Sequence, residues 1–159
     1  MSAVKRRMLI ALAAVPGLFV SLYLLLYKLG VYGTLACGQG GSCSVVQASS
    51  YARFLDVPVA GWGAGWYVAV LGVALWGAHR AGDSAGGGSA DGLFGPAGLL
   101  LALAASGFLF SAYLTGLEMW VIEAFCRWCL VSAGLSTVIM GLAVPEARRV
   151  LASRSGRAD

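Results

Sequence analysis

The chain has 159 residues, of which 59% are hydrophobic and only 11% are charged. Soluble domains carry about 25% charged residues, so this low charge content argues against a water-soluble globular domain. The formal net charge of +4 comes from basic residues at the ends of apolar segments, a pattern that indicates membrane topology rather than nucleic-acid binding.

Four stretches without charged residues are long enough to cross a bilayer, which requires roughly 20 apolar residues. They comprise residues 8–27, 57–78, 92–117 and 128–145. We predict an all-α integral membrane domain at residues 1–147, a four-transmembrane-helix bundle, followed by a cytoplasmic basic tail at residues 148–159. The predicted spans are about residues 8–28, 57–78, 93–117 and 126–145.

The first apolar stretch follows Lys5, Arg6 and Arg7, which resemble the basic region of a signal peptide. Its apolar run is longer than that of a signal peptide, and residues 21–25 contain no small-x-small cleavage site. We therefore expect this stretch to remain in the protein as the first membrane helix.

Lysine and arginine residues predict that both termini lie in the cytoplasm. In that orientation, eight basic residues lie inside: Lys5, Arg6, Arg7, Arg80, Arg148, Arg149, Arg154 and Arg157. Three lie outside: Lys28, Arg53 and Arg127. Because inner loops are enriched in basic residues, we predict a multi-pass protein of the cytoplasmic membrane with its cysteines on the outer face.

The longest outer connection, residues 30–56, contains Cys37 and Cys43. Three glycines separate them and predict a mobile, water-exposed loop: Gly38, Gly40 and Gly41. Residues 44–55 lack glycine and proline and predict a short amphipathic helix that caps the bundle at the membrane surface. Pro58 is expected to open the second span.

The two remaining connections are predicted to be simpler. Residues 81–91 contain a run of three glycines and a serine and predict a flexible polar linker on the inner side. The turn between the third and fourth spans is short, and Glu118 and Glu123 are expected to end helices in water.

Cys126 and Cys129 form a C-x-x-C motif at the predicted outer end of the fourth span. Cysteines three apart share one helix face and can close a disulfide, and the partial positive charge of a helix N-terminus stabilises a thiolate. A lipid-soluble molecule can reach this pair from the bilayer. A structural disulfide or half of a metal site are the alternatives. We predict no metal site, because C-x5-C is poor zinc spacing and the single histidine, His79, lies on the opposite side.

The spacing of Cys37 and Cys43 allows two interpretations, a static disulfide or a shuttle. A mobile loop can present one cysteine to a soluble partner and the other to the membrane-embedded pair, because a thiolate must reach the sulfur that it attacks. The outer side of a bacterial membrane is also where disulfides persist.

Taken together, these motifs resemble the bacterial members of the vitamin K epoxide reductase family. The matching features are Cys37-x5-Cys43, Ser49 six residues later, Pro58, and the motif Cys126-Arg127-Trp128-Cys129. The resemblance extends from about residue 15 to residue 142. It implies a four-helix bundle around a quinone, with residues 44–55 as a short outer cap helix.

The resemblance also implies roles for individual residues. Cys126 and Cys129 correspond to the active-site pair, with Cys129 facing the quinone. In the loop pair, the partner attacks Cys37, and Cys43 exchanges with Cys126. Ser49 matches the loop serine near the quinone site of the family.

The resemblance thus implies a thiol:quinone oxidoreductase that reoxidises an extracytoplasmic thioredoxin-like (DsbA-like) protein, reduces menaquinone or ubiquinone, and supports disulfide formation. A separate soluble partner is expected because the chain ends soon after the fourth span, without a fused thioredoxin-like domain. DsbB, an unrelated bundle with two outer cysteine pairs, performs the same reaction, so this function does not depend on one fold. The alternatives are a vitamin K quinone or epoxide reductase that uses small thiols, and a non-catalytic membrane subunit with two structural disulfides.

Two positions depart from the animal enzymes of this family. Ala133 stands where they carry a quinone-contacting tyrosine, and apolar residues near Val59 stand where they carry an asparagine. These departures favour simple quinone reduction over epoxide reduction. Trp62 and Trp66 are the candidates to line a flat quinone ring, although an aromatic belt at the membrane interface is the default interpretation.

Overall fold

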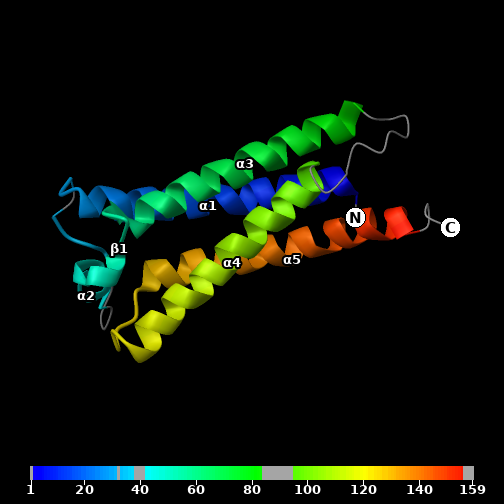
Figure 1. Ribbon diagram of the computed structural model, residues 1–159. Helices are drawn as coiled ribbons and strands as arrows, with labels where there is room; N and C mark the ends of the chain where they lie inside the picture. Colours follow the sequence, from blue (N-terminus) through cyan, green and yellow to red (C-terminus); the bar gives the residue numbers. More distant parts are fainter. Residues whose placement is uncertain (1, 32, 38–41, 84–94, 156–159) are drawn as a thin grey trace.

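The computed structural model describes residues 2–31, 33–37, 42–83 and 95–155, and this part of the chain is almost entirely helical. The long helices are α1 (Ala3–Lys28), α3 (Val59–Asp83), α4 (Pro96–Trp120) and α5 (Arg127–Ser155). They form a bundle, as Figure 1 shows, and the predicted all-α fold is confirmed. Short elements gather at one end: α2 (Cys43–Ala48), η1 (Ser50–Ala52), β1 (Arg53–Phe54) and β2 (Val57–Pro58).

Each long helix contains a segment that is long and apolar enough to cross a membrane. These segments are Ala3–Lys28, Val59–Ala81, Pro96–Trp120 and Arg127–Pro145. Their outward faces expose large apolar side chains, among them Leu12, Phe19, Val68 and Leu109. Exposed apolar surface of this extent requires a lipid environment, and the protein is therefore a multi-pass membrane protein.

The first helix begins earlier than the predicted span. Ser2 precedes it, and its hydroxyl oxygen accepts a hydrogen bond from the backbone N–H of Lys5 at 3.3 Å. A serine in this position satisfies a backbone donor that the first helical turn leaves unpaired. The basic residues that precede the apolar run therefore belong to the helix rather than to a separate tail.

The helices alternate in direction along the bundle. The start of α1 and the end of α5 lie at one end, whereas α2 and the small hairpin lie at the other (Figure 1). Helix α1 packs against α3 and α5, and α4 packs against α5 and α3.

The contact between α1 and α3 depends on small residues. The buried core joins residues of these two helices, among them Ile10, Ala11, Ala14, Tyr67, Val70 and Ala74. Gly17 lies under the Tyr67 ring, and a Cβ atom at this position would be only 2.2 Å from the ring. Small residues let membrane helices approach closely, which matters because lipid gives them no hydrophobic driving force to associate.

The cap helix is shorter than predicted, because α2 ends at Ala48. After η1, strands β1 and β2 pair in antiparallel register and reverse the chain. Leu55 and Asp56 form the turn with φ of 53° and 61°, the left-handed conformation of the central residues of a tight hairpin. The prediction of one helix over residues 44–55 was therefore wrong in its second half. Pro58 lies in β2, so α3 begins one residue after it.

Side chains of three long helices hold the cap in place. The carbonyl oxygen of Phe54 accepts a hydrogen bond from the indole N–H of Trp62 at 3.2 Å. The Phe54 ring packs edge-on against Trp62 and Phe110, with centroids 6.2 and 6.4 Å away. The ammonium group of Lys28 donates to the carbonyl oxygen of Gln47. These contacts hold the cap over the bundle from α1, α3 and α4.

Several predicted segments fall outside the described residues. They are the glycines between Cys37 and Cys43, most of the inner linker at residues 81–91, and the last residues of the predicted tail. The first part of that tail is helical, since α5 continues past Pro145 to Ser155.

Candidate active site

All four cysteines lie at the capped end of the bundle. Cys37, Cys43 and Cys126 share one buried cluster, and Cys129 packs against it. Cys37 and Cys43 form a disulfide with their Cα atoms 6.1 Å apart, whereas Cys126 and Cys129 are free thiols. The structure thus brings the two sequence-predicted pairs together.

The loop pair is more buried than the sequence suggested. Cys37 is 8% exposed and Cys43 is 0% exposed, although the sequence predicts a water-exposed loop, whose glycines lie outside the described residues. The burial of Cys37 follows from the preceding residue, Ala36, because both of its backbone polar groups are hydrogen-bonded to side chains of the long helices. Its N–H donates to the hydroxyl of Tyr23 at 3.0 Å, and its carbonyl accepts from the indole N–H of Trp128 at 3.1 Å. Helices α1 and α5 therefore fix this segment against the bundle.

Cys126 occupies the position that caps the N-terminus of α5. The backbone N–H of Cys129 donates to the sulfur of Cys126 at 3.4 Å, the bond that a capping serine oxygen commonly accepts. The hydrogen bond from the Cys129 thiol is the main cause that lowers the pKa of Cys126, and backbone N–H groups of Cys129 and Trp128 act in the same direction. A lowered pKa favours the nucleophilic thiolate.

The role of the Cys129 thiol in this effect can be measured. In a protein with Cys37 and Cys43 changed to alanine, Cys129→Ser and Cys129→Ala each leave Cys126 as the sole thiol. The serine hydroxyl can still donate to Cys126, so we expect its thiolate to form at lower pH in the serine variant than in the alanine variant. Thiolate absorbance in the ultraviolet, followed against pH, gives both curves. Superimposed or reversed curves would contradict this assignment.

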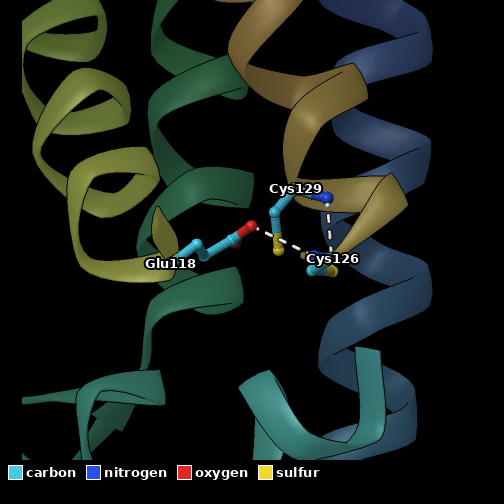
Figure 2. A group of neighbouring side chains, drawn as sticks. All are labelled: Glu118, Cys126 and Cys129. Carbon is cyan, nitrogen blue, oxygen red and sulfur yellow. Dashed lines mark hydrogen bonds between the residues drawn. The ribbon is translucent and has the colours of Figure 1, made fainter. Parts of the chain in front are cut away.

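Glu118 lies beside the free thiols, and the expectation that it ends a helix in water was wrong. It is 3% exposed, and its Oε2 accepts a hydrogen bond from the backbone N–H of Cys126 at 3.0 Å. Figure 2 shows its side chain reaching from α4 toward both cysteines. A carboxylate oxygen and the two sulfur atoms all lie within 4.8 Å of one another. By contrast, Glu123 is exposed in the turn, as expected.

A cavity of about 380 Å³ opens beside this group, between the helices. Cys129 and Glu118 line it, whereas Cys126 is not among its described lining residues. Three of the predicted quinone-contacting residues also line it: Trp62, Trp66 and Ala133. Ser49 does not, because it lies after α2 and its hydroxyl donates to the carbonyl of Val46 at 2.7 Å. Its predicted quinone contact stays a prediction.

The cavity is mainly apolar and aromatic, with a few polar groups. The hydroxyl of Tyr67 bonds both the carbonyl and the hydroxyl oxygen of Ser132, each at 3.0 Å. The side chain of Gln47 on α2 is buried and also lines the cavity. Apolar walls with a few placed polar groups are typical of small-molecule sites, so this cavity fits a flat, lipid-soluble ligand such as a quinone. Tyr67 belongs to the same group of aromatic residues as Trp62 and Trp66 in the sequence, whereas Gln47 was not predicted to lie at this site.

A metal site is the other chemistry to consider at Glu118, Cys126 and Cys129. Within the described part of the chain, only these three side chains of ligand type gather here. A structural zinc site uses four ligands, usually from cysteine and histidine. The prediction that no metal binds here stays a prediction.

Comparison with known proteins gives one result. A family model described as the vitamin K epoxide reductase family matches residues 8–144, which is most of the chain. A search of curated proteins gives no match. The matched region includes α3, α4, the cap and both cysteine pairs, and it covers most of α1 and the larger part of α5.

Proposed function

The chain belongs to the vitamin K epoxide reductase family, and we propose that it is a membrane thiol:quinone oxidoreductase. Its proposed donor is an extracytoplasmic thioredoxin-like protein, and its proposed acceptor is menaquinone or ubiquinone. One observation carries this proposal. Cys129 lines the apolar cavity, while Cys126 is buried beside the Cys37–Cys43 disulfide. Such an arrangement connects a thiol pair that can receive electrons from a protein with a cavity that can hold a quinone.

The first half of the proposed reaction is exchange between the donor and the loop pair. A thiolate of the reduced donor attacks Cys37, which keeps slight exposure, and Cys43 leaves as a thiolate. The second thiol of the donor then attacks the mixed disulfide with Cys37, so that the donor leaves as a disulfide and Cys37 becomes a free thiolate. This step transfers two electrons to Cys37 and Cys43.

The second half transfers the electrons inward. Cys43 attacks Cys126 in the oxidised helix pair, and Cys129 leaves as a thiolate. Cys37 then attacks Cys43 in this mixed disulfide, which re-forms the loop disulfide and releases Cys126 as a thiolate. The resulting state has a loop disulfide and two free helix thiols, as the structure has. The helix dithiol then gives two electrons to the quinone, which is the substrate that accepts them, and becomes a disulfide again.

The function is tested by quinone reduction in the purified protein. We expect a reduced thioredoxin-like donor to drive reduction of a short-chain quinone analogue, followed by the change in quinone absorbance. Cys37→Ala should reduce the donor-driven rate to background, because the loop disulfide that the donor attacks can no longer form. Absence of donor-driven reduction in the wild-type protein, or an unchanged rate in Cys37→Ala, would contradict the proposal.

The proposed orientation places the capped end outside the cytoplasm. Leu55 lies in the exposed hairpin turn at that end, and His79 is exposed near the opposite end of α3. In a background without the native cysteines, Leu55→Cys is expected to react with a membrane-impermeant maleimide on intact cells. His79→Cys should react only after permeabilisation, and the reverse pattern would place the cap inside.

A further inference from the structure

Reduction of a quinone by a dithiol moves protons as well as electrons, and we propose that Glu118 carries the protons from the cysteine pair to the quinone oxygens. The inference rests on the proposed thiol:quinone function. The overall change balances, because the S–H bonds of Cys126 and Cys129 break and one S–S bond forms. The two electrons and two protons released appear on the quinone as two O–H bonds. The dithiol is oxidised, the quinone is reduced, and no other reactant is required.

The cavity offers few groups that can exchange a proton. Among its described lining residues, only Tyr67, Glu118 and Cys129 have ionisable side chains. Cys129 is itself one of the reacting groups. The hydroxyl of Tyr67 is engaged by Ser132, at 3.0 Å from both the carbonyl and the hydroxyl oxygen. Glu118 is therefore the lining residue best suited to take up a proton and release it.

The position of Glu118 connects the sulfur atoms with the cavity. One of its carboxylate oxygens lies within 4.8 Å of the sulfur atoms of both cysteines, and the residue also lines the cavity. Its Oε2 accepts the hydrogen bond from the backbone of Cys126 at 3.0 Å, which fixes the carboxyl group beside both sulfur atoms (Figure 2). A proton can thus pass from a thiol to the carboxylate and from there to an oxygen of the bound quinone.

The burial of Glu118 also argues for a chemical role. Burying a carboxyl group in an apolar site costs folding free energy, and Glu118 is only 3% exposed. Ionisable residues within membrane-spanning segments are usually functional. Capping of α5 alone does not require an acid. A glutamine would accept the same hydrogen bond from the backbone of Cys126 without a charge.

This difference between glutamine and glutamate provides the test. In the full-length protein in lipid nanodiscs, pre-reduced and mixed with a short-chain quinone analogue, Glu118→Gln should reduce the quinone about 10²-fold more slowly or worse, the range of general acid–base catalysis. Glu118→Asp keeps a carboxyl group and should recover part of the rate. Glu123→Gln, an exposed neighbour in the turn, should match the wild-type protein.

A second readout does not depend on turnover. The infrared difference spectrum between the reduced and oxidised protein, recorded without quinone, should contain a carboxyl band that is shifted in Glu118→Asp, absent in Glu118→Gln and retained in Glu123→Gln. The wild-type and Glu118→Asp spectra decide this point even if Glu118→Gln does not fold. A wild-type spectrum without the band, a wild-type rate in Glu118→Gln, or equal rates in Glu118→Gln and Glu118→Asp would overturn the inference. If the wild-type protein itself reduces no quinone, the proposed function fails instead.

Discussion

Replacing Cys129 with serine is expected to lower quinone reduction to the uncatalysed rate while the protein stays folded. Cys129 is the one cysteine of the four that lines the described cavity, so no other sulfur is placed to pass electrons to a ligand there. Serine keeps the size and a hydrogen-bond donor but cannot form a disulfide. The measurement is single-turnover quinone reduction, with thermal unfolding in detergent as the control for folding. A Cys129→Ser variant with wild-type turnover would contradict the assigned role of Cys129.

The proposed exchange between Cys43 and Cys126 predicts which two cysteines can form a disulfide when Cys129 is absent. In a protein with Cys37 and Cys129 both changed to alanine, Cys43 and Cys126 remain, and both are fully buried in one cluster. Mild oxidation should join them in an intramolecular disulfide, detected by mass spectrometry. The matched control, with Cys43 and Cys129 changed to alanine, leaves Cys37 and Cys126 and should form much less. Equal yields in the two proteins would remove the basis for assigning exchange to Cys43.

Replacing Gly17 with alanine is expected to destabilise the whole bundle. The added Cβ atom would be 2.2 Å from the ring of Tyr67, which is 2% exposed, so the ring would have to leave its packed position. Overpacking of this kind typically costs about 1–3 kcal/mol. Displacement of the ring also disturbs the bonds of Tyr67 to Ser132, so quinone affinity should fall as well.

Thermal unfolding in detergent measures this effect, and Gly134→Ala provides the control. Gly134 lies in α5 with no atom within 4 Å of its added Cβ, so alanine there should leave stability unchanged or slightly raised. Equal unfolding temperatures for the Gly17→Ala and wild-type proteins would contradict the role assigned to this close contact.

The four membrane-spanning helices could be predicted from the sequence, because a span depends on length and apolarity, which a single sequence displays directly. The proximity of the two cysteine pairs could also be predicted, since the family resemblance placed both pairs at one end of the bundle. Trp62, Trp66 and Ala133 line the cavity, and their contact with a quinone stays a prediction. The cap was predicted less well, because a stretch without glycine or proline at residues 44–55 conceals a hairpin whose turn uses Leu55 and Asp56.

The position of Glu118 could not be derived from its charge alone. Acidic residues near helix ends usually face water, and the direction of a side chain in the last turn depends on where the next segment leads. Here the chain returns after α4 so that α5 begins opposite Glu118. One signal was present in the sequence, because Glu118 is the only charged residue of α4 and lies seven residues after Ser111, on the same face of the helix. Gln47 gave no comparable signal, since its burial depends on the cap.

The complete burial of Cys126 affects how resistant its thiol is to irreversible oxidation. A cysteine with a lowered pKa is normally the one most easily lost to peroxide, which converts an accessible thiolate to sulfenic and then irreversibly to sulfinic acid. Cys126 is 0% exposed beneath the loop disulfide, so dissolved peroxide has no direct path to its sulfur. The packing that places this thiolate for exchange with its neighbours thus also protects it from irreversible damage.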